Sequence, residues 1–262
     1  MKKTTKKTVE ANDFEKTLRS FYGKHSLWDV WSDWTTMFAT SLSQAHDYRE
    51  EREKRYLSIA EKYSRDELEK FCELGALLVL ELEKNPEQDF LGETFMNLGL
   101  GDHYNGQFFT PYHVSELMAM CSCGDSCSQI RQNGYITIND CSCGSGVMLI
   151  SSFHTIRATL SKENPALNAQ NHVLAAAQDI NETAAMMCYI QLSLLGIAAV
   201  IKIGNTLTEP MTGNLLNMPR SPELWFTPMY NFPVWRDRQL IQGVMSLFAA
   251  SASKKNEKLD IT

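Results

Sequence analysis

The stretch DCSCGSG (residues 140–146) decides the fold, because it joins a strand to a helix through a turn that contains two glycines. The preceding residues 135–140 (YITIND) alternate in the way that is typical of a β-strand, and a helix is expected to begin near Val147. Glycine adopts positive φ angles and lets a ligand approach the backbone without a Cβ clash. A lone G-x-G turn is common in proteins, so only the elements around it can indicate a ligand site.

Two further strands follow the glycine turn. Residues 173–178 form an apolar run that ends at Asp179, residues 182–195 are expected to be helical, and residues 198–203 form a third strand. Strand, turn, helix, strand, helix, strand is the first half of a doubly wound parallel sheet. The sequence therefore predicts an α/β fold with a partial doubly wound, Rossmann-like sheet.

The chain upstream of this sheet reads as helical. Residues 14–100 carry apolar side chains at three- and four-residue spacing. Trp28, Trp31 and Trp34 recur at every third position, which favours a place in the helical core over base stacking. These patterns divide the chain into an N-terminal helical region (residues 1–100), an α/β core (residues 101–215) and an aromatic, basic C-terminal tail (residues 216–262).

Polar side chains stand at the ends of all three predicted strands. In an open parallel sheet, ligands bind beyond the carboxyl ends of the strands. Asp140 precedes the glycine turn, and Asp179 can either accept hydrogen bonds from both ribose hydroxyls or cap the helix that starts near Asn181. Asn205, after the third strand, can pair with an adenine edge or form a turn. Together these turns predict a nucleotide-type pocket.

Composition narrows the class of protein. The formal net charge of −6 argues against a stand-alone protein that wraps nucleic acid, but not against a subunit whose partner contacts the phosphates. No apolar run approaches the roughly 20 residues of a membrane-spanning helix, and no signal core follows the first residues, so a cytoplasmic protein is expected. Cys121, Cys123 and Cys127 lack the paired spacing of zinc ligands, so no metal site is predicted.

Four motifs occur in a fixed order: GQFFTP (residues 106–111), DCSCGSG (140–146), QDIN (178–181) and GNTL (204–207). DFLGETF (89–95) stands upstream of them. This set resembles the adenine-N6 DNA methyltransferases, and in particular the modification subunit of type I restriction-modification systems. The resemblance covers residues 89–207 and implies S-adenosylmethionine as cofactor and DNA as substrate.

The resemblance also implies a role for each matching position. The cofactor would be walled by the first motif and held by the three strand ends, through Phe108, Phe109, Thr110, Pro111, Asp140, Gly144, Ser145, Gly146, Asp179 and Asn205. The glycine turn and Asp140 would hold the methionine portion, Asp179 the ribose, and Asn205 the adenine, where the family often has Asp. Thr110 and Pro111 are also expected to start a helix, with the hydroxyl as its cap. Cys141-Ser142 replaces a common Pro-Ala pair, and this small change is expected to be tolerated.

The family's Asn-Pro-Pro-aromatic motif, which grips the extruded base, is absent from the sequence. The nearest strings are NMPR (217–220) and NFPVW (231–235), so Asn231 and Trp235 are the only catalytic candidates. The remaining residues are too few for the other strands of a full sheet, and an open edge is expected beside the third strand. The aromatic stretch LWFTPMY (224–230) is expected to cover that edge, with base stacking or partner docking as alternatives.

Two functions from different classes follow. The first is a DNA adenine-N6 methyltransferase, completed by a specificity subunit or another methyltransferase subunit. The second is a catalytically inactive methyltransferase-fold module that acts as a DNA-associated or regulatory interaction protein. A methyltransferase that modifies protein or RNA is a third reading.

Overall fold

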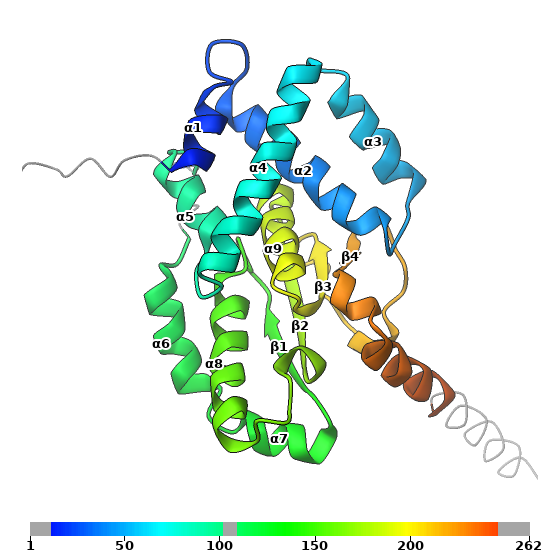
Figure 1. Ribbon diagram of the computed structural model, residues 1–262. Coiled ribbons are helices and arrows are strands. Elements are labelled where there is room, and N and C mark those ends of the chain that lie inside the picture. The colour runs from blue at the N-terminus through cyan, green and yellow to red at the C-terminus, as the bar shows by residue number, and fades with distance from the viewer. Residues whose placement is uncertain (1–11, 102–108, 246–262) are drawn as a thin grey trace, which may run out of the picture.

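The computed structural model describes residues 12–101 and 109–245. Its N-terminal part is helical, as predicted, and occupies the upper part of the molecule in Figure 1. The five helices are α1 (Asp13–Arg19), α2 (Leu27–Gln44), α3 (Glu50–Ala60), α4 (Arg65–Lys84) and α5 (Phe90–Asn97). Among the described helices, none is both long and apolar enough to cross a bilayer.

Helix and strand alternate in the second half of the chain. The order is α6 (Tyr112–Ser122), α7 (Ser126–Asn133), β1 (Ile136–Asp140), α8 (Val147–Glu163), β2 (Val173–Asp179), α9 (Glu182–Leu194), β3 (Ala198–Ile203) and β4 (Leu224–Phe226). Short 3-10 turns lie at η1 (Ala169–Asn171), η2 (Leu215–Asn217) and η3 (Pro228–Asn231), and residues 233–245 are helical. The fold is therefore mixed α/β, and the three predicted strands are confirmed to within one residue.

The aromatic residues of α2 form the core of the helical region. Trp31 and Trp34 are buried, and the indole Nε1 of Trp34 donates to the Phe71 carbonyl at 3.1 Å. Trp28 is 37% exposed and meets Phe95 edge-on. The predicted core position is thus confirmed for two of the three tryptophans, while Trp28 lies at the border of the core.

The sheet has the strand order β1-β2-β3-β4. The first three strands are parallel, and β4 runs antiparallel to β3. Because the strand order advances in one direction from β1 to β3, the reversal that defines a doubly wound sheet is not found among the described strands. The connecting helices α8 and α9 pack against the sheet, and α9 in turn packs against α2.

The two faces of the sheet bury different partners. On one face, Ala175, Ala177 and Ile201 join α8, α9 and the N-terminal helices in one continuous apolar core. On the other face, Leu174 and Val200 pack against the segment that contains η2, β4 and η3. Alternate side chains of β2 and β3 therefore point into separate cores, which explains why both strands are apolar throughout.

The aromatic stretch covers one edge of the sheet, as predicted. Trp225 pairs with Ile201 and Phe226 with Val200, so β4 closes the edge of β3. The edge that the three parallel strands alone would leave open beside β3 is thus covered by this three-residue strand, which returns antiparallel to it. Among the described strands, the unpaired edges are the outer edge of this short strand and the edge of β1.

Candidate functional site at the carboxyl ends of the strands

The glycine turn follows β1 directly, as predicted. Gly144 has φ +53° and Gly146 has φ +97°, and Gly146 is the N-terminal cap of α8. A Cβ atom on Gly144 would lie 3.0 Å from the ring of Phe109, and one on Gly146 would lie 2.9 Å from the sulfur of Cys188. The turn therefore requires glycine at both positions, for backbone conformation and for space.

Asp179 ties the end of β2 to this turn. Its carboxylate accepts from the Gly144 amide at 2.8 Å through Oδ2 and from the Asn181 amide at 2.8 Å through Oδ1. The helix cap of α9 is Asn181, which accepts from the Ala184 amide, and not Asp179. The helix-cap alternative for Asp179 is therefore excluded, and its carboxylate lies against the glycine turn.

The end of β3 joins the same cluster. The Gly204 amide donates to the Asp179 carbonyl at 2.9 Å, and the Thr206 hydroxyl donates to the Cys141 carbonyl at 2.6 Å. Asn205 uses its side-chain oxygen to accept from the Leu207 amide at 2.9 Å, so it forms the turn that was its alternative role. The three strand ends thus meet at one edge of the sheet.

Residues 109–111 of the GQFFTP motif lie over this cluster. Phe109 stands against Gly144 and contacts Phe95 of α5, with ring centroids 5.4 Å apart. Phe108 lies outside the described residues. The helix that was expected to begin at Pro111 begins at Tyr112, with Pro111 as its cap and no side-chain cap bond from Thr110. The helix therefore begins one residue later than expected. Thr110 and Pro111 line a groove together with Asp89 and Phe109.

Sequence reasoning missed a buried polar network beneath the turn. Asp89 is 1% exposed, and its carboxylate accepts from the Gly92 amide at 2.9 Å, from Gln191 Nε2 at 2.8 Å and from the Ser145 hydroxyl. Gln191 also donates to the Ser145 carbonyl at 2.9 Å. A Cβ atom on Gly92 would lie 2.0 Å from the Asp89 carboxylate, which explains the glycine in DFLGETF. The upstream motif therefore holds the glycine turn in place.

Two apolar side chains near the strand ends were also missed. Ile180 follows Asp179 and is 68% exposed, and Leu207 follows the Asn205 turn and is 92% exposed. Both side chains leave apolar surface open to solvent beside the polar strand ends. Their position directly after a strand-end polar residue is the sequence signal that could have identified them.

Burial changes the acidity of the site. Burial raises the pKa of Asp140, and the neighbouring Asp179 carboxylate raises it further, while the Ser142 amide donates to Asp140 at 3.1 Å. The Cys143 thiol has a pKa well above its usual value, because it is hydrogen-bonded to Cys188 and buried. Cys143 is therefore a neutral packing residue and not a nucleophile.

The described cysteines are free thiols. Within residues 12–101 and 109–245, no three His, Cys, Asp or Glu side chains are grouped so that they could hold a metal ion.

The two catalytic candidates lie away from this edge. Trp235 is fully buried, and its Nε1 donates at 3.0 Å to the carbonyl of Gln170, which precedes β2. Asn231 accepts from Arg220 at 2.8 Å and donates to Thr227, whose hydroxyl bonds the start of β3. Both residues therefore stand toward the amino ends of the strands, whereas Asp179 lies at the other end of β2, a strand about 20 Å long. This placement corrects their proposed part in a base pocket.

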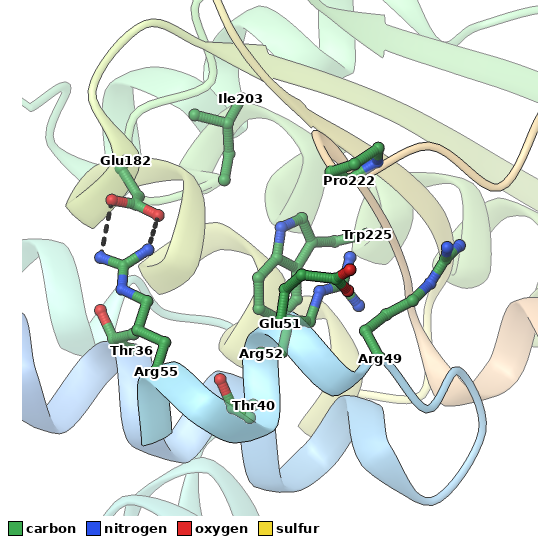
Figure 2. Close-up of a pocket in the computed structure, with 10 residues that line it drawn as sticks. All are labelled: Thr36, Thr40, Arg49, Glu51, Arg52, Arg55, Glu182, Ile203, Pro222 and Trp225. Carbon is green, nitrogen blue, oxygen red and sulfur yellow. Dashed lines mark hydrogen bonds and ion pairs between the residues drawn. The ribbon is translucent and has the colours of Figure 1, made fainter. Parts of the chain in front are cut away.

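A second cavity, of about 160 Å³, opens where the N-terminal helices meet the end of β3 (Figure 2). Arg55 of α3 forms a two-pronged ion pair with Glu182, the first residue of α9. Arg52 lies 3.6 Å from the ring centroid of Trp225 and donates to the Leu224 carbonyl at 2.7 Å. These arginines fix the helical region to the carboxyl edge of the sheet.

The comparisons with known proteins agree with the geometry. A family model described as N-6 DNA Methylase matches residues 98–259, which include the glycine turn, all four strands and the aromatic stretch. Comparison with curated proteins and with solved structures finds no match. Because the family model matches more than half of the chain, the chain belongs to the N-6 DNA methylase family.

Proposed function

We propose that this chain binds S-adenosylmethionine at the carboxyl ends of β1, β2 and β3 and serves as a DNA adenine-N6 methyltransferase, similar to a type I modification subunit. The observation that carries the proposal is the Asp179 carboxylate, which joins the glycine turn to the end of β2. The α/β core (residues 101–215) then provides one half of a Rossmann-like sheet. It lies in the chain between the helical region (residues 1–100) and the C-terminal tail (residues 216–262).

The residues present fit such a cofactor. Each Asp179 carboxylate oxygen accepts one backbone amide, and each retains lone pairs for a ribose hydroxyl. The glycine turn, with Asp140 and Ser145, opens α8, where backbone amides favour a carboxylate such as that of methionine. Asn205, whose side-chain amide donates to none of the described residues, would face the adenine.

The exposed apolar side chains support the same pocket. Ile180 and Leu207 flank the polar strand ends, and an adenine ring would cover part of each. Phe109, against Gly144, would wall the methionine side, together with Thr110 and Pro111. When bound, S-adenosylmethionine supplies an activated methyl group, and the protein holds and orients it.

The target base needs residues that this sequence does not carry. No Asn-Pro-Pro-aromatic motif is present, and Asn231 and Trp235 stand at the other end of the sheet. We therefore propose that a specificity subunit or another methyltransferase subunit completes the active enzyme on DNA. The same observation favours the second candidate, a module that binds the cofactor without catalysis and acts as an interaction protein.

Calorimetric titration with S-adenosylmethionine tests the cofactor site. Asp179→Ala is expected to weaken binding at least 10-fold, whereas Glu69→Ala, on the exposed surface of α4, leaves it unchanged. If Asp179→Ala binds as tightly as the natural chain, the placement of the pocket is wrong. Circular dichroism of both variants checks that the fold is intact.

Labelled methyl transfer separates the two candidates. Transfer to unmethylated DNA, alone or with candidate partner subunits, supports the enzyme if it is lost in Asp179→Ala. Cofactor binding without transfer under every pairing supports the non-catalytic module. Label in protein or RNA with none in DNA would overturn both.

A further inference from the structure

The outer edge of β1 has no strand partner among the described residues. In the ladder with β2, the Ile136 amide donates to the His172 carbonyl, so residues 136, 138 and 140 direct their backbone groups toward β2. Because these groups alternate along a strand, the N–H and C=O of Thr137 and Asn139 point away from the sheet. Among the described residues, nothing donates to or accepts from them. Four strong hydrogen-bonding groups therefore face outward.

A groove runs along this edge. It has a volume of about 620 Å³, and it is walled by the edge of β1, by α6 and the start of α7, and by the first turns of α8. Side chains that line it include Met118, Ala119, Leu149 and Ser152. β1 itself is only half-buried, whereas β2 and β3 are buried almost throughout. None of the residues that the structure describes fills this position at the border of the sheet.

We propose that this groove takes an extended strand from a separate polypeptide, which pairs through its backbone with Thr137 and Asn139. Edge strands with unpaired backbone groups are templates for such addition, and main-chain bonds then supply affinity while side-chain pockets supply specificity. Within the described part of the chain, the lining carries the carboxylates Asp125 and Asp140 and no lysine or arginine. The incoming strand is therefore apolar on its groove face and neutral or basic, not acidic.

The helices around the groove argue against a second copy of this chain. α6 packs beside α8 at the β1 side of the sheet (Figure 1), and its residues Met118 and Ala119 roof the groove. A second copy that paired β1 with β1 would bring its own α8 into the space that α6 occupies. A strand without a helix on that face fits beneath α6. The exposed side chains of Leu117 and Met118 offer further apolar contact.

The described remainder of the chain is engaged elsewhere. β4 closes the opposite edge, and in the helix after it Arg238 donates to the Gly134 carbonyl at 2.9 Å, below the amino end of β1. A strand in the groove would lie beside Asp140, at the edge that holds the glycine turn. The partner would thereby add residues to that site, a consequence that rests on the proposed function, whereas the docking itself does not.

A random 12-residue peptide library displayed on phage, panned against the full chain, tests the proposal. Selected peptides are synthesised with a fluorophore, and their binding is measured by anisotropy. We expect peptides with alternating apolar residues. Met118→Glu, in the groove, is expected to weaken their binding at least 10-fold, while Met120→Glu, exposed on the same helix but outside the groove, changes it less than 3-fold.

Backbone pairing has its own controls. Asn139→Pro removes an outward amide without touching the bonds to β2, and is expected to abolish binding that Asn139→Ala retains. Peptides methylated at alternate backbone nitrogens should also fail, which keeps the test valid if the proline variant does not fold. Peptides that bind all variants equally, or a library that yields none, would overturn the proposal.

Two further outcomes would reassign the groove. If peptides bind at least 10-fold tighter after removal of residues 246–262, the chain's own terminus occupies it. If peptides dissociate a dimer that is seen by sedimentation, a second copy of the chain occupies the groove. Calorimetry with S-adenosylmethionine on Met118→Glu is expected to match the natural chain, so failure of strand docking and failure of the cofactor site remain distinguishable.

Discussion

Asp89 offers the sharpest test of the network beneath the glycine turn. Asp89→Ala removes the acceptor shared by Gly92, Ser145 and Gln191. Each buried donor left without a partner costs about 1–3 kcal/mol. Removal of a carboxylate whose pKa is raised by burial returns part of that cost. We expect the free energy of unfolding to fall by about 3–5 kcal/mol.

Asp89→Asn is the matched control. The amide keeps one oxygen for the Gly92 and Gln191 donors, and the Ser145 hydroxyl can turn to accept from the new NH₂ group. We expect a loss of only about 1 kcal/mol. Urea unfolding followed by tryptophan fluorescence measures both variants. Equal stabilities for the alanine and asparagine variants would refute the shared-acceptor network.

The same pair makes a prediction about pH. Because burial raises the pKa of Asp89, the folded protein binds its proton more tightly than the unfolded chain does. This carboxyl therefore adds stability as pH falls from its folded pKa toward the unfolded value near 3.9. Asp89→Asn lacks this term. The stability of the natural chain relative to the variant should therefore rise as pH falls through that window.

Three further predictions concern other parts of the molecule. Burial lowers the pKa of His154 to about 4, so stability should fall by roughly 3 kcal/mol as pH drops from 6.5 to about 4, and His154→Leu should remove that slope in urea titrations. Hydrogen bonds from Ser64 lower the pKa of Glu67 to about 2, so its contribution is lost as pH falls from about 4.5 to about 2; acid unfolding of Glu67→Gln should lack this component. Trp235→Phe removes the bond to Gln170 and some core volume, and should lower stability by about 1–2 kcal/mol while calorimetry shows unchanged affinity for S-adenosylmethionine. A large loss of cofactor affinity in Trp235→Phe would contradict its assignment to the opposite end of the sheet.

Local patterns made the strand ends predictable. An apolar run that stops at an acidic residue, or a strand that enters a glycine turn, is encoded within about 10 residues. β2 and β3 were therefore located to within one residue, and their polar ends could be placed at one edge because parallel strands share a direction. The prediction that Asp140, Asp179 and the Asn205 turn converge followed from that geometry.

Contacts between distant segments could not be predicted in the same way. Asp89 and Gln191 are 102 positions apart, and neither belongs to a pattern that indicates the other. The three residues of β4 are too few to signal which strand they pair with. Trp235 was linked to base stacking by its proximity to Asn231 in the sequence, but the fold carries it to the far end of the sheet.

The partial exposure of β1, in contrast, is encoded in its local sequence pattern. β2 and β3 are apolar at nearly every position, as strands covered on both faces must be. β1 alternates Ile136, Thr137, Ile138 and Asn139, and its burial alternates in the same rhythm. Because successive side chains point to opposite faces of a sheet, exposed polar side chains at alternate positions indicate that one face of the strand is not covered. The alternation therefore predicts that one face of β1 is open, whereas the backbone ladder, and not the side-chain pattern, identifies its unpaired edge.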